Sequence, residues 1–310
     1  MRLEARLWLE IVIILTVVAL IGFFPRQVAA VALHVAGRSS HCELRAAVTG
    51  AEAFAFQSKA HYRIASQSVR LSESSDGMVK WKTPHGEVYF PASDPAPLFF
   101  DLAEQERGIY SSFGLGVKPG DVVLDCGANI GLYSKVALSQ GARLVIAIEP
   151  VPVNVAALRL NLAAEIAANK VIVVEKGVWH KDDWLEMSVD HDNLAANSFV
   201  GSREGARPEA IQKVRLPLTT IDALASELKL PRVDFIKMDI EGAERNALQG
   251  GRHTITRFHP RMAICVYHRP DDPEVVSRSV HQMWPGYTQV CGPCQIAGYS
   301  VRPEVYFFHE

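Results

Sequence analysis

The spacing of apolar positions changes along this chain. From about residue 120 onward, short runs rich in β-branched residues alternate with longer segments whose apolar residues recur at helical spacing. This alternation predicts an α/β fold, in which a doubly wound, mostly parallel sheet of Rossmann-like type is covered by helices. The predicted strands are 122–125, 144–149, 171–175, 233–239, 262–268, 286–290 and 304–308. The predicted helices are 129–140, 153–168, 221–229, 243–258 and 273–283.

A different pattern precedes this region. Residues 79–82 and 87–90 alternate polar and apolar side chains around a Thr-Pro-His-Gly turn, which predicts a β-hairpin in a small β annex. Three prolines then interrupt the chain before residue 98. We therefore predict a preamble over residues 28–97 and a main domain over residues 98–310.

The N-terminus carries an apolar stretch without charges at residues 11–24. Counted from Leu7, it would form a helix of roughly 27 Å, against a bilayer hydrocarbon core of roughly 30 Å. Three interpretations are open: an uncleaved membrane anchor over residues 1–27, a signal peptide cleaved near Ala30, or a core helix. We favour the anchor, and thus predict an N-terminal hydrophobic helix and a membrane-attached protein.

Composition narrows the possible partners. The 310 residues are 48% hydrophobic, with 32 basic and 34 acidic side chains. A chain of this kind can bury a large core and is not a disordered tail. Its near-neutral charge lacks the basic field that holds proteins on nucleic-acid phosphates, so we predict no nucleic-acid partner.

Candidate cofactor chemistry begins at the end of the first predicted strand, with Asp125-Cys-Gly-Ala-Asn-Ile-Gly131. Gly127 and Gly131 would let the backbone approach a ligand and begin a helix, and Asp125 could accept hydrogen bonds from a ligand ammonium. The second strand ends at Glu149, where a carboxylate can accept both hydroxyls of a ribose. Together these features predict an adenosine-type cofactor.

The glycine spacing discriminates between such cofactors. Dinucleotide folds use G-x-G-x-x-G, whereas this loop has Asn129 at the place of the second glycine, so a pyrophosphate would lack its closest approach. S-adenosylmethionine has no phosphate and presents an ammonium and a carboxylate instead. Methyl transfer is therefore favoured, and a nicotinamide-dependent oxidoreductase remains the alternative.

Four ordered motifs resemble the FkbM-type S-adenosylmethionine-dependent methyltransferases. They are the loop at 125–134, Ile148-Glu-Pro-Val-Pro-Val-Asn154, Phe235-Ile-Lys-Met-Asp-Ile-Glu-Gly-Ala-Glu244 and Ile264-Cys-Val-Tyr-His268. The resemblance implies a class I methyltransferase fold with seven strands, the last one antiparallel. It also implies O-methylation of a sugar or another small hydroxyl-bearing metabolite.

The resemblance also suggests roles for individual residues. By matching position, Asp125, Gly127, Asn129 and Gly131 would hold the methionine part of the cofactor, and Glu149 its ribose. Asp239 would face the sulfonium. Trp179, near the expected adenine site, is as compatible with packing as with binding.

Methyl transfer to a hydroxyl also needs a group that removes the hydroxyl proton. We predict His268 as this base, because its unperturbed pKa lies near neutrality, with Asp239 and Glu241 as rivals. Carboxylates at a strand end could instead bind Mg²⁺, but His268 stands where a carboxylate cage would want Asp or Asn. The sequence thus leaves a metal-assisted mechanism open without supporting it, and we assign no metal ligands.

Cys291-Gly-Pro-Cys294 resembles a thioredoxin-type redox motif and leaves a membrane-tethered redox or binding module as a further alternative. The motif is not followed by the long helix that redox function requires, so we predict a turn there. Cys42, Cys126 and Cys265 are predicted to be thiols that are either buried or without a functional role. Because the cofactor is made in the cytosol, we expect an anchored catalytic domain to face the cytoplasm.

Overall fold

The computed structural model describes residues 16, 22–39, 41–75, 77–91, 94–190 and 211–310. The chain divides into two compact units. Unit 1 consists of Met1–Phe56 and Pro293–Glu304, and unit 2 consists of Gln57–Gly292 and Val305–Glu310. The predicted boundary at residue 97 does not coincide with this division.

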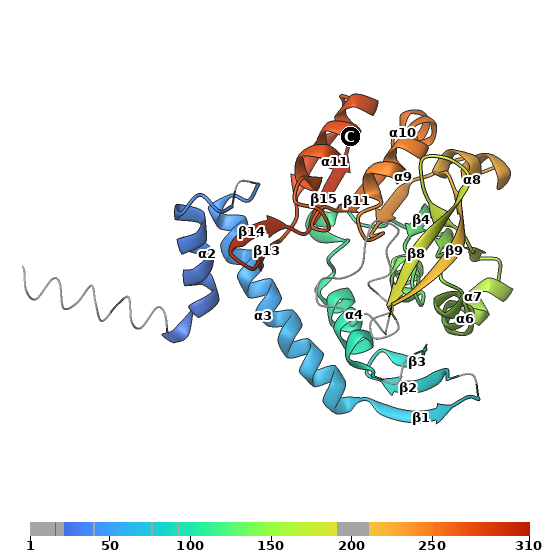
Figure 1. Cartoon of the computed structure of the whole chain (residues 1–310), viewed down its shortest axis with the longest axis horizontal. Helices are drawn as coiled ribbons and strands as arrows, with labels where there is room; N and C mark the ends of the chain where they lie inside the picture. Colours follow the sequence, from blue (N-terminus) through green and yellow to red (C-terminus); the bar gives the residue numbers. More distant parts are fainter. Residues whose placement is uncertain (1–15, 17–21, 40, 76, 92–93, 191–210) are drawn as a thin grey trace, which may run out of the picture. The chain divides into compact units, whose positions relative to one another are not determined.

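A seven-stranded sheet forms the centre of unit 2 (Figure 1). Its strands lie in the order β12 (Thr288–Cys291), β15 (Val305–His309), β11 (Arg261–Cys265), β10 (Phe235–Met238), β4 (Val122–Cys126), β5 (Leu144–Ile148) and β6 (Val171–Val174). β15 pairs antiparallel with both neighbours, and the remaining pairs are parallel. The predicted mostly parallel sheet and its antiparallel last strand are confirmed.

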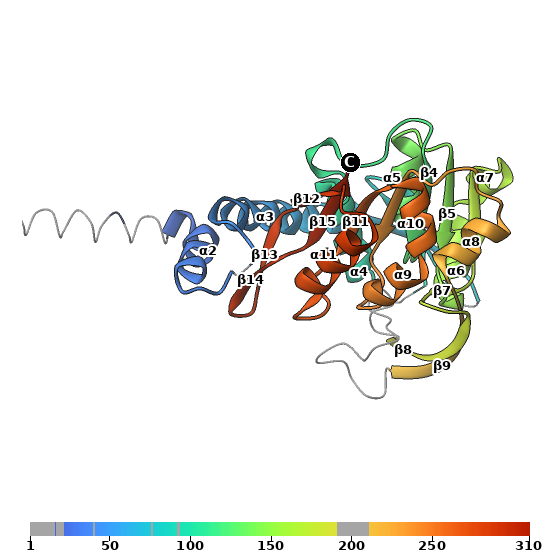
Figure 2. The same ribbon diagram turned by 90° about the horizontal axis from the view of Figure 1, so that it is seen from above.

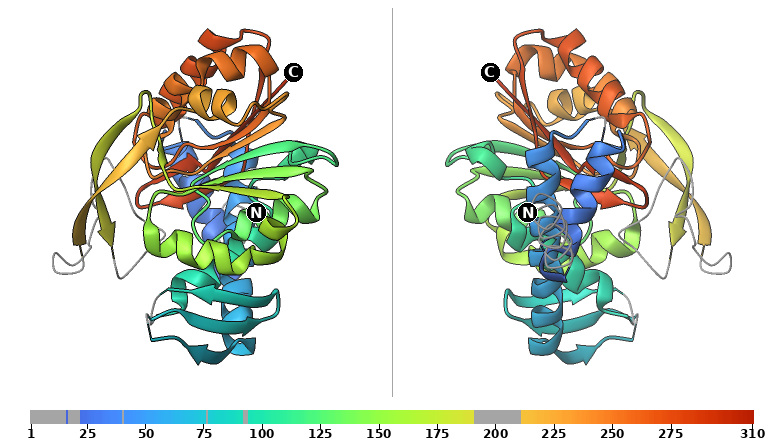
Figure 3. Two further views of the ribbon diagram at one scale, coloured as in Figure 1. Left: turned by 90° about the vertical axis from the view of Figure 1, so that its right-hand side faces the viewer. Right: turned by 90° about the vertical axis from the view of Figure 1, so that its left-hand side faces the viewer.

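Helices cover both faces of this sheet, because successive side chains of its strands point to opposite sides. Val122 and Leu124 belong to a core that includes residues of four helices, whereas Val123 belongs to a second core on the other face. In Figure 3, the orange helices and the green helices lie on opposite sides of the sheet. The first set is α8 (Ile221–Glu227), α9 (Glu244–Gly250), α10 (Arg252–Phe258) and α11 (Asp272–Met283), and the second is α5 (Leu132–Ser139), α6 (Pro152–Asn161) and α7 (Ala163–Ala167).

Some boundaries differ from the predicted ones. The segment 243–258 contains two helices, α9 and α10, which meet at Gly251, and the segment 153–168 contains α6 and α7, which meet at Leu162. β11 ends at Cys265, so His268 lies in the loop beyond the strand and does not end it. This loop position lets His268 approach the loop after β10, as described below.

Smaller sheets flank the central one. The predicted hairpin is present as β2 (Val79–Thr83) and β3 (Gly86–Phe90), and β1 (Val69–Glu73) adds a third strand. These strands pack with α4 (Ala96–Arg107), which is followed by a short 3₁₀ turn at Ser112–Gly114. A further sheet of β7 (Gly177–Val178), β9 (Ile211–Thr219) and β8 (Asp183–Asp190) includes a long β8–β9 arm that curves away from the centre (Figure 2).

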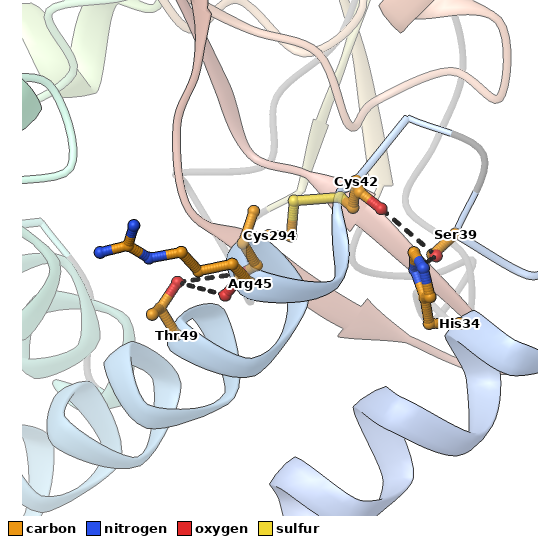
Figure 4. Close-up of a disulfide and its surroundings, with 7 residues drawn as sticks. His34, Ser39, Cys42, Arg45, Thr49 and Cys294 are labelled. Carbon is orange, nitrogen blue, oxygen red and sulfur yellow. Dashed lines mark hydrogen bonds between the residues drawn. A yellow bond between two sulfur atoms is a disulfide. The ribbon is translucent and has the colours of Figure 1, made fainter.

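Unit 1 contains α2 (Pro25–Val35), the first part of α3 (Leu44–Gln67) and the hairpin of β13 (Cys294–Ala297) and β14 (Ser300–Pro303). Its two chain segments are joined by a disulfide between Cys42 and Cys294, shown in Figure 4. They also meet through a hydrogen bond from the Val301 N–H to the Arg38 carbonyl, at 2.8 Å. Gly50 of α3 packs directly against the backbone of Cys294. A Cβ at this position would lie 1.5 Å from the carbonyl oxygen of Cys294.

The disulfide corrects one prediction and excludes one alternative. Cys42 is not a free thiol, and Cys294 is bonded to Cys42 rather than to Cys291, so Cys291 and Cys294 do not form a dithiol motif. Cys126 and Cys265 are buried thiols, as predicted.

Removing this bond gives a testable stability effect. We expect replacement of both Cys42 and Cys294 by serine to lower the free energy of unfolding of unit 1 by about 2–5 kcal/mol, because the two segments lose their covalent constraint. Unit 2 has its own hydrophobic cores, so its resistance to proteolysis should not change. Limited proteolysis followed by mass spectrometry should detect earlier cleavage within residues 22–56. Cys291→Ser, which keeps the bond, is the control, and equal resistance of the double variant would contradict the expectation.

The predicted membrane anchor is corrected. No helix among the described residues is both long and apolar enough to cross a bilayer. This finding contradicts the predicted membrane-anchored localisation and leaves the N-terminal hydrophobic helix of the predicted fold unsupported. Residues 7–15 and 17–21 of the apolar stretch lie outside the described residues.

Candidate active site

The loop after β4 approaches the loop after β10 very closely. Gly127 has a φ of 81°, and a Cβ at this position would lie 1.9 Å from the backbone oxygen of Asp239. The Asp239 N–H donates to the carbonyl of Cys126 at 3.2 Å, which joins the two loops. Only glycine fits here, so Gly127 brings the carboxyl ends of β4 and β10 together.

Asn129 and Gly131 complete this loop in different ways. Asn129 has a φ of 49°, which is unusual for a residue with a side chain, and its N–H donates to Glu149 Oε2 at 2.9 Å. Its Oδ1 is buried and has no hydrogen-bond partner among the described residues. Gly131 instead faces the protein interior, where a Cβ would lie 2.8 Å from Leu162. Asn129 therefore offers an acceptor to a ligand, whereas Gly131 serves packing.

Glu149 follows β5 directly and is 5% exposed. Its Oε1 accepts from the Val151 N–H at 3.0 Å and from Asn154 Nδ2 at 3.4 Å. Burial raises the pKa of Glu149 to about 7, although the N–H groups of Val151 and Asn129 oppose this shift. The side chain is thus held in one orientation at the end of the strand, where the sequence predicts it.

Asp125 lies beneath the loop and is fully buried. Its Oδ2 accepts from Ser134 Oγ at 2.7 Å, and Lys237 Nζ lies 3.4 Å from its Oδ1. Lys237 in turn donates to the carbonyl of Gly127 at 2.8 Å. Burial lowers the pKa of Lys237, but the carboxylates of Asp125 and Asp239 outweigh burial and raise it above its usual value. Asp125 therefore positions the loop from below, and it does not line the cavities described next.

Two adjoining cavities open beside these loops. Both are lined by Gly127, Asn129, Asp239 and Glu241. The smaller cavity, of about 60 Å³, extends past Glu149 toward the predicted adenine region. Its further lining includes Lys176, Gly177, Val178 and Met187, whereas Trp179 packs in a small apolar cluster with Leu218 and Ala243.

The larger cavity, of about 540 Å³, lies on the other side of Asp239. Carboxylates and aromatic rings dominate its wall: Asp94, Asp101, Glu104, Phe100, Tyr110 and Tyr267. Burial raises the pKa of Asp101 to about 7, and the nearby charge of Asp239 adds to this shift. The wall can therefore accept many hydrogen bonds and also pack against apolar surface.

Asp239 stands where the two cavities meet. Its Oδ2 accepts from the hydroxyl of Tyr110 at 2.6 Å, and its Oδ1 lies 3.4 Å from His268 Nε2. Burial alone would raise the pKa of Asp239, but Lys237, His268 and the Tyr110 hydroxyl outweigh it and lower the pKa below its usual value. The structure thus holds Asp239 as a carboxylate.

Glu241 follows two residues later in a strained conformation. Its φ of 54° lies in the left-handed region, which side-chain-bearing residues rarely adopt and which often marks functional sites. Its Oε2 lies 3.7 Å from His268 Nε2. Burial raises the pKa of Glu241 to about 7, although His268 opposes the shift.

His268 lies behind these two carboxylates and lines neither cavity. Its Nδ1 is 3.0 Å from Oε1 of Glu244, which is fully buried. Burial lowers the pKa of His268, but Glu244, Glu241 and Asp239 together raise it to about 10. The structure therefore gathers the three predicted catalytic residues, with Asp239 and Glu241 at the cavity wall and His268 one layer deeper.

Tyr110 and Lys237 belong to this site but are not among the residues predicted from the sequence. Tyr110 comes from a segment without a motif, and nothing in its neighbourhood distinguishes it from a core aromatic residue. Lys237 carries a usable signal, because a lysine inside an otherwise apolar strand is rarely buried without partners.

Comparisons with known proteins bear on this site. A family model described as the methyltransferase FkbM domain matches residues 125–292, which is more than half of the chain. Over 165 residues the chain is 29% identical to the 31-O-demethyl-FK506 methyltransferase FkbM of Streptomyces tacrolimicus, covering 46% of this chain and 63% of that protein. It is 26% identical over 176 residues to the AMB antimetabolite synthetase AmbE of Pseudomonas aeruginosa, covering 46% of this chain and 8% of that protein.

Among solved structures, the methyltransferase FkbM of Methylobacillus flagellatus KT is similar, with a TM-score of 0.46 and 20% identity. The match covers 70% of this chain and 56% of that one. This chain thus spans less than two-thirds of the length of each of these proteins. The family model covers the loop after β4, Glu149, the loop after β10 and His268 in one continuous match, and the chain belongs to the FkbM methyltransferase family.

Proposed function

We propose that this protein transfers a methyl group from S-adenosylmethionine to a hydroxyl of a sugar or another small metabolite. The observation that carries the proposal is the meeting of two cavities at Asp239, one leading to Glu149 and one opening toward a polar and aromatic wall. Membership of a methyltransferase family supports use of this cofactor.

The residues present fit S-adenosylmethionine. Glu149 offers a buried carboxylate to the two ribose hydroxyls, and Asn129 offers a buried oxygen that has no partner among the described residues. Gly127 and Asn129 would hold the methionine part, and Asp239 would lie near the sulfonium. When bound, the cofactor supplies a methyl group, which an acceptor oxygen takes from sulfur as the hydroxyl proton leaves.

Geometry favours Glu241 as the group that takes this proton. Glu241 lines both cavities, whereas His268 lines neither and faces Glu244 with its Nδ1. One oxygen of Asp239 is already engaged by the Tyr110 hydroxyl. We therefore assign proton removal to Glu241, and we assign the orientation of the two cavity carboxylates to Tyr110 and His268.

The wall of the larger cavity supports a hydroxyl-rich acceptor. Carboxylates such as Asp101 and Glu104 accept hydrogen bonds from hydroxyls, and the rings of Phe100 and Tyr267 can pack against the C–H faces of a sugar. Transfer of a labelled methyl group from S-adenosylmethionine to a panel of sugars and other hydroxylated metabolites tests the proposal. Label on an acceptor oxygen supports it, whereas label found only on nitrogen or carbon would contradict O-methylation.

The ionisation of Glu149 should set the pH dependence of cofactor binding. The carboxylate accepts both ribose hydroxyls only when ionised, so affinity should rise through pH 7 and level off above it. Below pH 7, affinity should fall by up to about tenfold per pH unit. Calorimetric titration with S-adenosylhomocysteine from about pH 5.5 to 8.5 measures this effect.

Two variants distinguish the ionisation of Glu149 from the ionisation of other groups that could affect cofactor binding. Glu149→Gln should lower affinity at high pH by about 10- to 100-fold and remove most of the pH dependence. Glu175→Gln is the matched control, because Glu175 is an exposed carboxylate just after β6 that contacts Arg159 and lines neither cavity. An unchanged pH profile in Glu149→Gln would contradict the ribose assignment.

A further inference from the structure

The imidazole of His268 lies beside the carboxylate of Glu244. Its Nδ1 lies 3.0 Å from Glu244 Oε1, and the same oxygen accepts from the Ile240 N–H at 2.9 Å. Both side chains are buried, at 7% and 0% exposure. A carboxylate at one ring nitrogen is the arrangement that orients metal-binding histidines, because it fixes the proton on Nδ1 and aims Nε2 at the metal.

The Nε2 atom faces two carboxylate oxygens without a directed hydrogen bond. It lies 3.4 Å from Asp239 Oδ1 and 3.7 Å from Glu241 Oε2. Within the described part of the chain, neither ring nitrogen of His268 has a hydrogen-bond partner, and neither has Asp239 Oδ1. Tyr110 engages the other oxygen of Asp239, so Oδ1 is the atom left to face Nε2. A nine-tenths buried histidine thus points an unsatisfied nitrogen at an unsatisfied oxygen.

These spacings suit a shared metal ion. The three ligand atoms all lie within 4.8 Å of one another. Two ligands bound at about 2.1 Å in a tetrahedral arrangement lie about 3.4 Å apart, close to the observed distances. The local charge also favours a cation, because the carboxylates of Asp239, Glu241 and Glu244 surround one imidazole. The nearby Lys237 donates to the carbonyl of Gly127.

From this arrangement we infer that His268 Nε2, Asp239 Oδ1 and Glu241 Oε2 form a binding site for a divalent first-row transition metal ion. One nitrogen and two carboxylate ligands suit ions such as Mn²⁺ or Zn²⁺. Binding would displace any proton on Nε2, as metal binding does at histidine generally.

The catalytic part of this inference rests on the proposed methyl transfer. Asp239 and Glu241 line the larger cavity, so an open coordination position there would bind the acceptor hydroxyl and lower its pKa. The oxygen of Glu241 that is not bound to the metal remains to take the hydroxyl proton. The metal and the carboxylate would then act on the same O–H bond.

Titration of the full-length chain with Mn²⁺, followed by electron paramagnetic resonance, tests the site directly. The signal of free Mn²⁺ should disappear with a stoichiometry of one ion per chain. His268→Gln and Asp239→Asn should each weaken binding by at least about tenfold, and Glu244→Gln by about 10- to 100-fold. Glu106→Gln, which removes a carboxylate outside both cavities, should bind Mn²⁺ like the unaltered chain.

Circular dichroism and thermal unfolding of the same samples report whether each variant is folded, and S-adenosylhomocysteine binding by the unaltered chain keeps the two proposals apart. A chain that binds S-adenosylhomocysteine but no Mn²⁺ at millimolar concentration overturns the metal site and leaves the proposed function standing. A chain that binds Mn²⁺ but no S-adenosylhomocysteine overturns the proposed function and leaves the metal site standing. Unchanged Mn²⁺ affinity in folded His268→Gln and Asp239→Asn also overturns the site.

Discussion

Replacing Glu241 with glutamine is expected to lower the turnover of methyl transfer by about 10²- to 10⁴-fold. The amide keeps the size of the side chain but cannot take the hydroxyl proton. Glu149 and Asn129 are untouched, so the affinity for S-adenosylmethionine should change little. Initial rates with saturating cofactor and the acceptor identified in the methyl-transfer screen give the turnover.

The control for this variant is Glu106→Gln. Glu106 is a carboxylate outside the two cavities that meet at Asp239, where it contacts Arg63 and His85, and its replacement should leave turnover near that of the unaltered protein. If Glu241→Gln keeps full turnover, Glu241 does not take the proton. If it instead loses cofactor affinity, Glu241 acts in binding.

Replacing Gly127 with alanine is expected to abolish cofactor binding and to lower the free energy of unfolding by about 3–5 kcal/mol. The new Cβ would lie 1.9 Å from the backbone oxygen of Asp239, so the ends of β4 and β10 would have to separate. That movement would displace Asn129 and Asp239 together. Urea unfolding and titration with S-adenosylhomocysteine measure the two effects.

Gly120→Ala separates the clash from backbone strain. Gly120 has a φ of 90°, similar to that of Gly127, but nothing lies within 4 Å of the position that a Cβ would occupy. This variant should therefore cost only about 1–2 kcal/mol, the strain of a left-handed residue, and should keep cofactor binding. Equal losses in the two variants would mean that the close approach of the loops is unimportant.

Local patterns suffice to predict the central sheet. Buried parallel strands need continuous β-branched and apolar runs, and all seven predicted runs occur as strands of the sheet. Helix boundaries are harder to predict, because the breaks at Gly251 and Leu162 occur inside continuous helical patterns. The 24-residue helix α3 is not among the predicted helices.

The site residues likewise differ in whether a local sequence pattern can predict them. Gly127 and Asn129 follow β4, Glu149 follows β5, and all three line a cavity. Local motifs reach these residues because the carboxyl ends of both strands are predicted. The Tyr110 bond to Asp239 spans 129 residues, and no local pattern encodes it.

The disulfide between Cys42 and Cys294 spans 252 residues and is equally hidden from local patterns. The environment of His268 depends on Glu244, Glu241 and Asp239 folding around it, and isolated pKa values cannot anticipate that arrangement.

Calorimetric titration of the full-length chain with S-adenosylhomocysteine, and in parallel with NAD⁺, is the most direct test of methyl-transfer chemistry at this site. We expect one S-adenosylhomocysteine to bind per chain, with affinity lowered by Glu149→Gln, and no heat of binding with NAD⁺. Absence of S-adenosylhomocysteine binding, or tighter binding of NAD⁺, would contradict the proposed function.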